Sequence, residues 1–268
     1  MTESVKPPCH VSGTAFITGG ASGIGKSIAH VFAQNGIENL ALVDVSIVNL
    51  ESAHTEFTTA YPHVKVETFT VDVTKEDQIA AAVQSTAEKF GRIDISIHGA
   101  GIGGRLSETH DLELQEWQAV IDVNQTGVML CDKWVVKQML TQELRPGYEG
   151  RGIIVNIASM FGVEASPGST GIVAYTAAKH AVVAISKVDA KTYADQGIRI
   201  NAICPGYVDT PLIRKGLESG VLAMEVEKTP LKRTARPEEI ADAVLFLSSR
   251  MGSYMCAGAL VIDGGYTA

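Results

Sequence analysis

The chain has 268 residues, of which 46% are hydrophobic and 19% charged, and its formal net charge is −8. This composition excludes a disordered or fibrous protein and is that of a globular chain long enough to bury a substantial core. The charges are spread without a basic block, which argues against nucleic acid or an anionic membrane as the main partner.

Cysteine and histidine spacings indicate neither a disulfide framework nor a metal site. The four cysteines (9, 131, 204 and 256) form no CxxC pair, and the seven histidines show no HExxH spacing. The N-terminal residues lack the basic start and apolar run of a signal peptide, and no 18 apolar residues are consecutive. We therefore predict a cytoplasmic protein with no metal site and no membrane span.

Strand and helix patterns alternate along the chain. Short, nearly continuous apolar runs predict strands at 14–18, 40–44, 64–71, 93–98, 152–158, 198–204 and 259–262. Amphipathic stretches predict helices over 25–35, 75–90, 114–140, 175–195 and 237–250. This alternation predicts an α/β fold, with one doubly wound parallel sheet of about seven strands and helices on both faces.

The segment 205–236 interrupts this alternation. It contains no clear strand, and it is too apolar for a disordered linker and too long for a simple connection. We interpret it as a substrate loop or lid with short helices, and a structural insertion is the alternative. No linker or repeat divides the chain, so residues 1–268 are predicted to form a single domain.

The turn after the first predicted strand has the residues that a phosphate site needs. Residues 18–25 read TGGASGIG and lead from a strand directly into a helix. The glycines let the backbone approach a pyrophosphate, and free N–H groups with the helix dipole hold its charge. Residues 20–27 also match the P-loop pattern GxxxxGK[ST], so a P-loop NTPase is an alternative here.

A second glycine-rich run and an acidic residue bear on this choice. Residues 99–104 satisfy the dinucleotide pattern GxGxxG, but no helix begins there, and we interpret them as a closely approached loop. Asp44 ends the second predicted strand, 19 residues after Gly25, where a dinucleotide site has an acid for the ribose hydroxyls. In a P-loop protein, Asp44 or Asp72 would instead hold magnesium.

Residues later in the chain decide between these alternatives. Tyr175 and Lys179 are four residues apart on a predicted helix and therefore share one face. An ammonium near a phenol lowers the tyrosine pKa, so that Tyr175 can act as general base on an alcohol or general acid on a ketone. Ser159 follows the strand at 152–158, at the sheet edge where ligands bind, and its hydroxyl can stabilise charge on a carbonyl oxygen.

With the glycine motif at 18–25, Asn124, Ser159, Tyr175-x-x-x-Lys179 and Pro205-Gly206 in this order, the sequence resembles the classical short-chain dehydrogenases/reductases over essentially its whole length. The resemblance implies a Rossmann-type fold and an oxidoreductase that moves a hydride between NAD(H) and a small-molecule secondary alcohol or ketone. It also implies a homotetramer, assembled in part through the C-terminal strand and residues 264–266.

The resemblance implies a role for each site residue. Asn124 supports Lys179 through a water molecule, Lys179 also holds the nicotinamide ribose, and Thr210 contacts the nicotinamide amide. Asp72 and Val73 resemble the pair beside the adenine. The expected cofactor-binding residues are Gly19, Ser22, Gly23, Ile24, Gly25, Asp44, Asp72, Val73, Ala100, Gly101, Tyr175, Lys179, Pro205, Gly206, Val208 and Thr210.

Asp44 also indicates which dinucleotide is bound. Its carboxylate can accept from both adenosine ribose hydroxyls and would repel a 2′-phosphate. Relatives that prefer NADP tend to place an arginine or lysine beside this position or in the glycine loop, where this chain has Val45, Ser46, Ala21 and Ser22. NAD is therefore the expected cofactor.

The sequence departs from the family pattern in two places. Relatives have Asn-Asn-Ala-Gly after the fourth strand, but this chain has HGAG at 98–101, and we interpret His98 as a structural substitute rather than a catalytic acid. Ser159 and Tyr175 are 16 residues apart, a longer spacing than in relatives, which leaves Ser166 and Ser169 as alternatives to Ser159.

The substrate pocket is expected to have mainly apolar walls, formed by residues 102–106, 160–168 and 207–224. These walls favour a hydrophobic or cyclic ketone or alcohol. Two other functions stay open: an NTPase would leave Asn124, Ser159, Tyr175 and Lys179 without a task, and a non-catalytic dinucleotide-binding protein would have no use for an activated phenol.

Overall fold

The structure is a computed structural model that describes residues 7–145, 150–218, 220 and 222–268, without the side chains of Ser169 and Lys215. Its centre is one seven-stranded parallel sheet in the order β3-β2-β1-β4-β5-β6-β7. The strands are β1 (Thr14–Thr18), β2 (Asn39–Asp44), β3 (Lys65–Thr70), β4 (Ile95–His98), β5 (Gly152–Ile157), β6 (Ile198–Pro205) and β7 (Ala259–Ile262). Their ends lie within two residues of the predicted ones, and the predicted Rossmann-type fold is confirmed.

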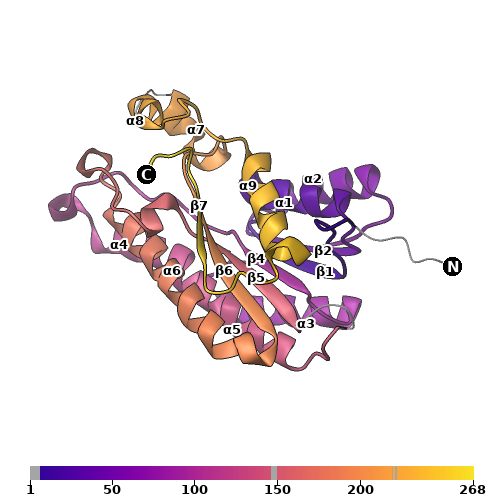
Figure 1. The fold of residues 1–268 in the computed structure, drawn as a ribbon. Helices are drawn as coiled ribbons and strands as arrows, with labels where there is room; N and C mark the ends of the chain where they lie inside the picture. The colour runs from indigo at the N-terminus through magenta and orange to yellow at the C-terminus, as the bar shows by residue number, and fades with distance from the viewer. Residues whose placement is uncertain (1–6, 146–149, 219, 221) are drawn as a thin grey trace.

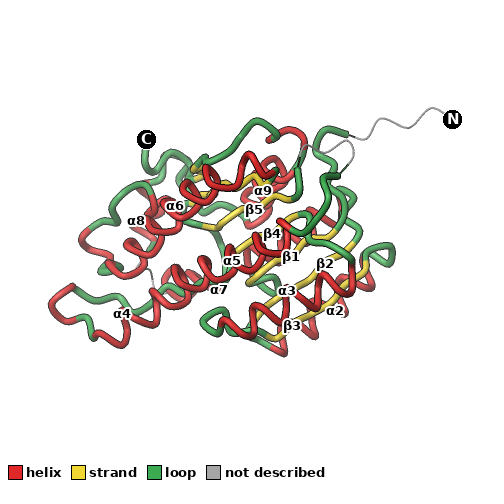
Figure 2. The backbone as a smooth tube through the Cα atoms, turned by 90° about the horizontal axis from the view of Figure 1, so that it is seen from below, coloured by secondary structure: helices red, strands yellow, loops and turns green. Residues whose placement is uncertain are grey.

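Helices cover both faces of this sheet, as Figures 1 and 2 show. One layer holds α1 (Gly23–Gln34), α2 (Ile47–Ala60) and α9 (Pro237–Ser248). The other holds α3 (Glu76–Phe90), α5 (Gly127–Leu140) and α6 (Val173–Tyr193). Between α4 (Leu114–Ile121) and α5, the chain continues as a turn of π-helix, Asp122–Thr126, so the helix expected over 114–140 is continuous but locally widened.

Strand residues alternate between the two faces, because neighbouring side chains on a strand point in opposite directions. Ile17 and Leu42 pack in one core with α1, α2 and α9, whereas Phe16 and Val43 pack in the other with α3 and α5. Since both faces are covered, the strands read in the sequence as nearly continuous apolar runs.

The order of the strands fixes the place of a ligand site. β2 and β3 lie on one side of β1, whereas β4 to β7 lie on the other, and in such sheets a crevice opens where the winding reverses, at the carboxyl ends of the strands. The helices α7 (Pro211–Glu218) and α8 (Ala223–Lys228) follow β6 and stand apart from the two layers, at the top of Figure 1. The segment 205–236 thus carries the short helices α7 and α8, and its role as a substrate loop or lid stays a prediction.

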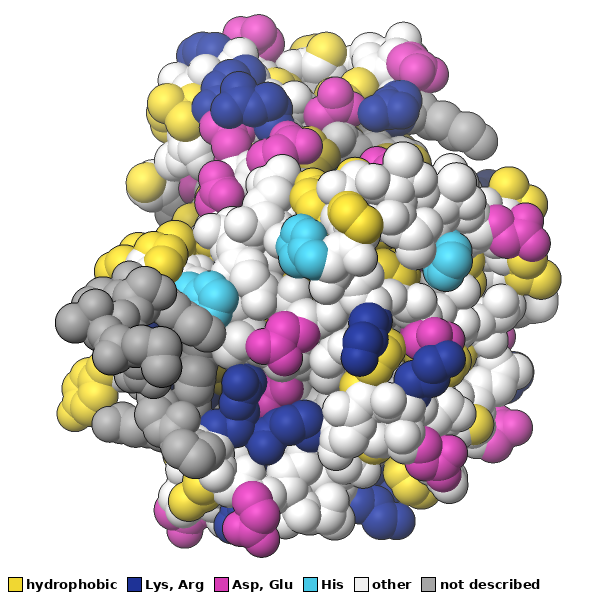
Figure 3. Space-filling view, turned by 90° about the vertical axis from the view of Figure 1, so that its right-hand side faces the viewer, with side chains coloured by type: hydrophobic (Ala, Val, Ile, Leu, Met, Phe, Trp, Pro, Cys, Tyr) yellow, Lys and Arg dark blue, Asp and Glu magenta, His cyan; other side chains and the backbone are white. Residues whose placement is uncertain are grey.

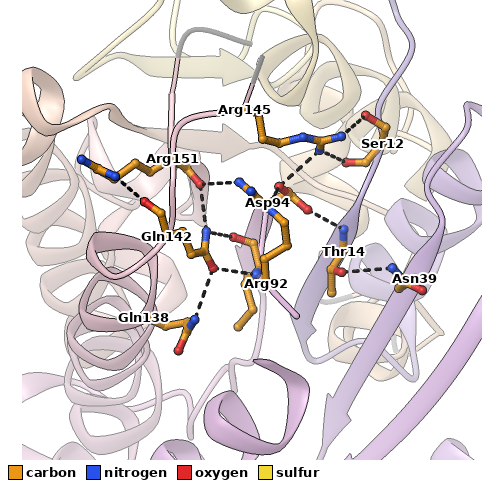
Figure 4. Close-up of polar contacts among 10 residues, drawn as sticks. Ser12, Thr14, Asn39, Arg92, Asp94, Gln138, Gln142, Arg145 and Arg151 are labelled. Carbon is orange, nitrogen blue, oxygen red and sulfur yellow. Dashed lines mark hydrogen bonds and ion pairs between the residues drawn. The ribbon is translucent and has the colours of Figure 1, made fainter. Parts of the chain in front are cut away.

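At the amino ends of the central strands, a buried carboxylate binds groups from several segments (Figure 4). Asp94, just before β4, accepts from the Thr14 N–H at 2.8 Å, and its other oxygen lies 2.6 Å from Arg92 Nε and 3.2 Å from an Arg145 nitrogen. Two guanidinium groups therefore compensate the charge of this carboxylate. The cluster fastens the start of β1 to the start of β4 and to the segment after α5.

The surface in Figure 3 carries charges of both signs, and lysine or arginine lies beside aspartate or glutamate in several places. No helix in the described part of the chain is long and apolar enough to cross a membrane. Among the same residues, no group of three or more His, Cys, Asp or Glu side chains could hold a metal ion.

Candidate active site

A cleft of about 600 Å³ opens at the carboxyl ends of the central strands. The turns after β1, β4 and β5 and the ends of β2 and β6 form its wall. All sixteen residues expected to bind a cofactor line it: Gly19, Ser22, Gly23, Ile24, Gly25, Asp44, Asp72, Val73, Ala100, Gly101, Tyr175, Lys179, Pro205, Gly206, Val208 and Thr210. Ser159 lines it too, whereas Asn124 is not among the described lining residues.

The glycine turn after β1 is shaped for close backbone approach. Gly19 has a φ of +67°, and a Cβ built on it would lie 2.9 Å from the backbone of Gly99 and Ala100. A Cβ on Gly25 would lie 2.3 Å from the carbonyl oxygen of Gly19. The side chain of Ser22, at the N-cap of α1, makes no capping hydrogen bond. The first N–H groups of α1 therefore face the cleft beside a bare backbone, which suits a pyrophosphate.

The lysine of the P-loop pattern does not serve this site. Lys26 Nζ lies 2.7 Å from Glu56 Oε2 on α2, and Lys26 is not among the described residues that line the cleft. A P-loop needs this ammonium on the nucleotide phosphates. The match to the P-loop pattern GxxxxGK[ST] is thus accidental, because its lysine does not reach the site.

Asp44 joins the end of β2 to the glycine turn. Its Oδ2 accepts from the Ala21 N–H at 3.3 Å, and its Oδ1 accepts from the Ser46 N–H at 3.0 Å. Both oxygens are thereby held at the rim of the cleft. Lys179 is the one lysine or arginine among the described lining residues, so no cation in this lining stands beside Asp44.

Tyr175 and Lys179 occupy neighbouring turns of α6 and face the cleft together. Lys179 Nζ lies 5.6 Å from the centroid of the Tyr175 ring and donates to the carbonyl oxygen of Ile157 at 2.8 Å. The lysine is thus anchored on the last residue of β5. The sequence did not predict the role of Ile157, because every residue has a backbone carbonyl and the residue type does not show which one accepts a hydrogen bond.

Burial decides the protonation of both groups. It raises the pKa of Tyr175, against the effect of a hydrogen bond with Ser159, and lowers the pKa of Lys179 to about 8, against the effect of the nearby Cys204 thiol. We predicted that Lys179 lowers the tyrosine pKa; in this structure the net shift is upward, because burial of the phenol has the larger effect. At neutral pH the cleft therefore presents a neutral phenol beside an ammonium.

Ser159 is the serine that lies at Tyr175. Besides its hydrogen bond with the tyrosine, its Oγ accepts from the Phe161 N–H at 3.2 Å. Ser166, one alternative, accepts instead from the Thr176 hydroxyl at 3.1 Å and is not among the described lining residues, whereas the side chain of Ser169 lies outside the described part. A loop accommodates the longer spacing between Ser159 and Tyr175. Its Ile172 forms an isolated parallel β-bridge with Ser107.

Asn124 lies behind the cleft, fully buried in the π-helical turn between α4 and α5. Its amide group both accepts from the Ile102 N–H, at 2.8 Å, and donates to the Ile102 carbonyl oxygen, at 2.7 Å. A Cβ built on Gly101 would lie 3.2 Å from Asn124 Oδ1 and 3.8 Å from Lys179 Nζ. Asn124 therefore holds the turn at Gly101 and Ile102, which lies beside Lys179.

A second contact that sequence reasoning missed holds the same turn from the other side. The Thr18 hydroxyl oxygen, at the end of β1, accepts from the N–H groups of Gly99 at 3.1 Å and Ala100 at 3.3 Å. The only sequence signal for it is the position of a threonine directly before the glycines.

The outer end of the cleft is apolar. Ile102, 38% exposed, faces α7, where Leu212 is 50% exposed and lies 3.8 Å from a Cβ built on Gly103. Pro211 and Ile213 complete this wall. The expected wall over 160–168 is not among the described lining residues, and its Met160 and Phe161 are buried.

Comparisons with known proteins agree with this geometry. A family model described as enoyl-(acyl carrier protein) reductase matches residues 19–267. Short-chain dehydrogenase srdC of Neurospora crassa is 38% identical, over 96% of this chain and 97% of its own length. Cis-4-hydroxycyclohexanecarboxylate dehydrogenase of Sinomonas cyclohexanicum is 37% identical, over 95% and 96%. Cyclohexanol dehydrogenase of an Acinetobacter species is 36% identical, over 94% of each chain.

A solved structure shows the same fold with a cofactor named in its description. The 3-ketoacyl-(acyl-carrier-protein) reductase from Brucella melitensis, complexed with NADH, superposes with a TM-score of 0.83 at 27% identity, covering 96% of this chain and 98% of that one. This chain belongs to the short-chain dehydrogenase/reductase family and is an oxidoreductase enzyme.

Proposed function

We propose that the protein uses NAD(H) to interconvert a secondary alcohol and its ketone, and that its substrate is a compact hydrophobic or cyclic molecule. The observation that carries the proposal is the convergence of Ser159, Tyr175 and Lys179 in the cleft that the glycine turn and Asp44 also line. This convergence supports the proposal, because a phenol, an ammonium and a glycine turn suited to a pyrophosphate line the same cleft.

The residues of the cleft fit a nicotinamide dinucleotide. The glycine turn and the start of α1 would hold its pyrophosphate, Asp44 its adenosine ribose, Asp72 and Val73 its adenine, and Thr210 its nicotinamide amide. Because no cation in the described lining stands beside Asp44, a 2′-phosphate would meet only negative charge, which supports NAD over NADP. When bound, the nicotinamide ring supplies or accepts the hydride.

The protein's own groups would handle the proton. The neutral phenol of Tyr175 donates to the carbonyl oxygen of a ketone, and the Ser159 hydroxyl donates to the same oxygen as charge develops on it. In the alcohol-oxidising direction, the Tyr175 phenolate accepts the alcohol proton. The Lys179 ammonium, held by Ile157, stabilises that phenolate.

The substrate class follows from the apolar outer end of the cleft. Ile102, Leu212 and Ile213 present aliphatic side chains, and the described lining there has no ionised group. The names of two relatives specify cyclohexane alcohols. Both observations support a ring-sized hydrophobic alcohol or ketone.

We further propose that the enzyme acts in the cytoplasm as a homotetramer. The edge strand β7 carries the apolar sequence ALVI, and all four of its residues are half-buried rather than buried. Apolar side chains on an unpaired edge support association with another copy through this edge. A molecular mass of one chain in light scattering would contradict the tetramer, and the proposed reaction would not be affected by that result.

Initial rates test the proposed function. Purified protein is assayed with NAD and NADP against cyclohexanol and 2-octanol, with Ser159→Ala and Ser166→Ala as a matched pair. We expect turnover with NAD, faster on the cyclic alcohol, a loss of about a hundredfold or more in Ser159→Ala and parent-like rates in Ser166→Ala. Faster turnover with NADP, or equal rates in the two variants, would contradict the assignment.

A further inference from the structure

A buried polar network lies under the cleft, at the position where the sequence departs from its family. His98, at the end of β4, and Asp132, on α5, are each only 1% exposed. His98 Nδ1 lies 2.8 Å from Asn156 Oδ1 and 3.0 Å from Asp132 Oδ1, and its Nε2 lies 2.8 Å from the Ser96 hydroxyl oxygen. Both oxygens at Nδ1 are acceptors, so this nitrogen carries a proton. The proton is donated to Asn156 Oδ1, and Asp132 Oδ1 is buried beside it without a hydrogen bond of its own.

Asn156 connects this pair to the helix that bears the catalytic residues. Its Nδ2 donates to Asp132 Oδ2 and to the Ser186 hydroxyl oxygen, both at 3.0 Å. Ser186 lies on α6, two turns after Lys179. The network thus joins β4, β5, α5 and α6 through side chains without exposure to solvent, where an incompletely paired group is costly.

The network is one residue away from the site at two points. Asn156 precedes Ile157, whose carbonyl oxygen accepts from Lys179 Nζ at 2.8 Å. His98 precedes Gly99, which lines the cleft and whose N–H is held by the Thr18 hydroxyl. A shift of either network side chain would therefore move the anchor of the lysine or the wall of the cleft.

We propose that His98 and Asp132 are positioning residues, which fix Lys179 through Asn156 and Ile157 and fix the 99–101 turn through Gly99. This role rests on the proposed function of Lys179. Two other titratable groups face Asp132: burial raises the pKa of the Cys131 thiol, and burial with the charge of Asp132 raises the pKa of Asp189. Neither offers Asp132 a positive charge, and its two oxygens are faced by His98 Nδ1 and Asn156 Nδ2.

Asp132→Asn tests this role because it keeps the shape of the side chain while giving the network too many donors. One acceptor becomes an NH₂ group facing either the His98 Nδ1–H or the Asn156 Nδ2–H, and Asn156 must move. The double variant His98→Asn, Asp132→Asn replaces both side chains by amides, which can donate to and accept from each other. Ile198→Ala, a buried change at the amino end of β6, controls for lost stability alone.

The measurements are the melting temperature, the dissociation constant for NADH as a function of pH, and the rate of NAD-dependent cyclohexanol oxidation well below that temperature. We expect Asp132→Asn to lose about tenfold in kcat and to shift the pH midpoint of NADH binding, since small misplacements of catalytic groups cost that much. The double variant should recover to within about threefold, because the two residues act as a unit.

A merely structural role predicts something different: every variant would lose melting temperature, yet kcat and the pH midpoint would match those of Ile198→Ala. That result would overturn the proposal. If Asp132→Asn does not fold, His98→Asn takes its place with the same two readouts. A parent protein that fails to bind NADH would instead reject the proposed function, which makes the two failures distinguishable.

Discussion

The Lys179 ammonium donates to the Ile157 carbonyl oxygen at 2.8 Å and lies 5.6 Å from the centroid of the Tyr175 ring. The two side chains share a face of α6, but the lysine is anchored on β5 rather than on the phenol. Burial therefore acts on each group separately, raising the pKa of the tyrosine and lowering that of the lysine. The chemistry of the cleft should depend on pH accordingly.

The two reaction directions are expected to have different pH optima. Ketone reduction needs the Tyr175 phenol and the Lys179 ammonium, so its kcat/KM should fall as pH rises through about 8, the pKa of the lysine. Alcohol oxidation needs the phenolate and should reach its maximum at higher pH. Rates of both directions over a pH series check this, and a reduction rate that still climbs above the lysine pKa would contradict it.

Replacing Lys179 should stabilise the fold while destroying the activity. Its pKa is about 8 in the folded protein against 10.5 ordinarily, so the charged form destabilises the folded state below pH 8, by about 3 kcal/mol. Stability of the parent should therefore rise with pH between these two values. Lys179→Met should raise the free energy of unfolding at neutral pH by about 1 to 2 kcal/mol, after loss of the bond to Ile157.

Urea unfolding of the parent and of Lys179→Met at neutral pH, and of the parent at alkaline pH, measures this effect. Ile157→Val serves as a control that keeps the carbonyl acceptor and the ammonium. A less stable Lys179→Met would mean that the ammonium is not destabilising where it lies.

Cofactor preference should depend on the charge of Asp44. Asp44→Asn keeps a side-chain oxygen for one of the two N–H groups that Asp44 binds and removes the negative charge. We expect the preference for NADH over NADPH to fall by about tenfold, since repulsion of the 2′-phosphate is lost. Titrations with both cofactors measure it, with Asp72→Asn as the matched control; an unchanged ratio would remove Asp44 as the discriminating group.

Lys26 should be dispensable for nucleotide binding. Its ammonium pairs with Glu56 on α2, and both side chains are about one-third exposed, so Lys26→Met should cost less than about 1 kcal/mol of stability. The dissociation constant for NADH should not change, and ATP with magnesium should not bind. A large loss of nucleotide affinity in this variant would restore the P-loop interpretation.

Much of the fold could be predicted from the sequence because its signals are periodic. The strands are covered on both faces and so read as apolar runs, and Tyr175 and Lys179 share a face because four residues make about one helical turn. Helix α2 was absent from the predicted set: only Leu50, Ala53 and Phe57 are buried along it, a weak stripe for a 14-residue helix.

The residues that line the site could be predicted from the sequence, but the contacts between them could not. Every expected cofactor residue lines the cleft, because most lie at or soon after the carboxyl end of a strand, while Tyr175 and Lys179 lie on the part of α6 that faces the same end. The partners of Lys179, Asn124 and His98 could not be predicted, since they are backbone groups or side chains from other elements that only tertiary packing brings near. The net rise in the Tyr175 pKa could not be predicted either, since burial of the phenol depends on tertiary packing.

Tyr175 is the group that we propose to transfer the proton. NADH binding and cyclohexanol turnover by Tyr175→Phe, measured beside the parent, test this role most directly. We expect an unchanged dissociation constant with a loss in kcat of at least about a hundredfold, because the phenyl ring fills the same space without the hydroxyl. Turnover equal to that of the parent would contradict it.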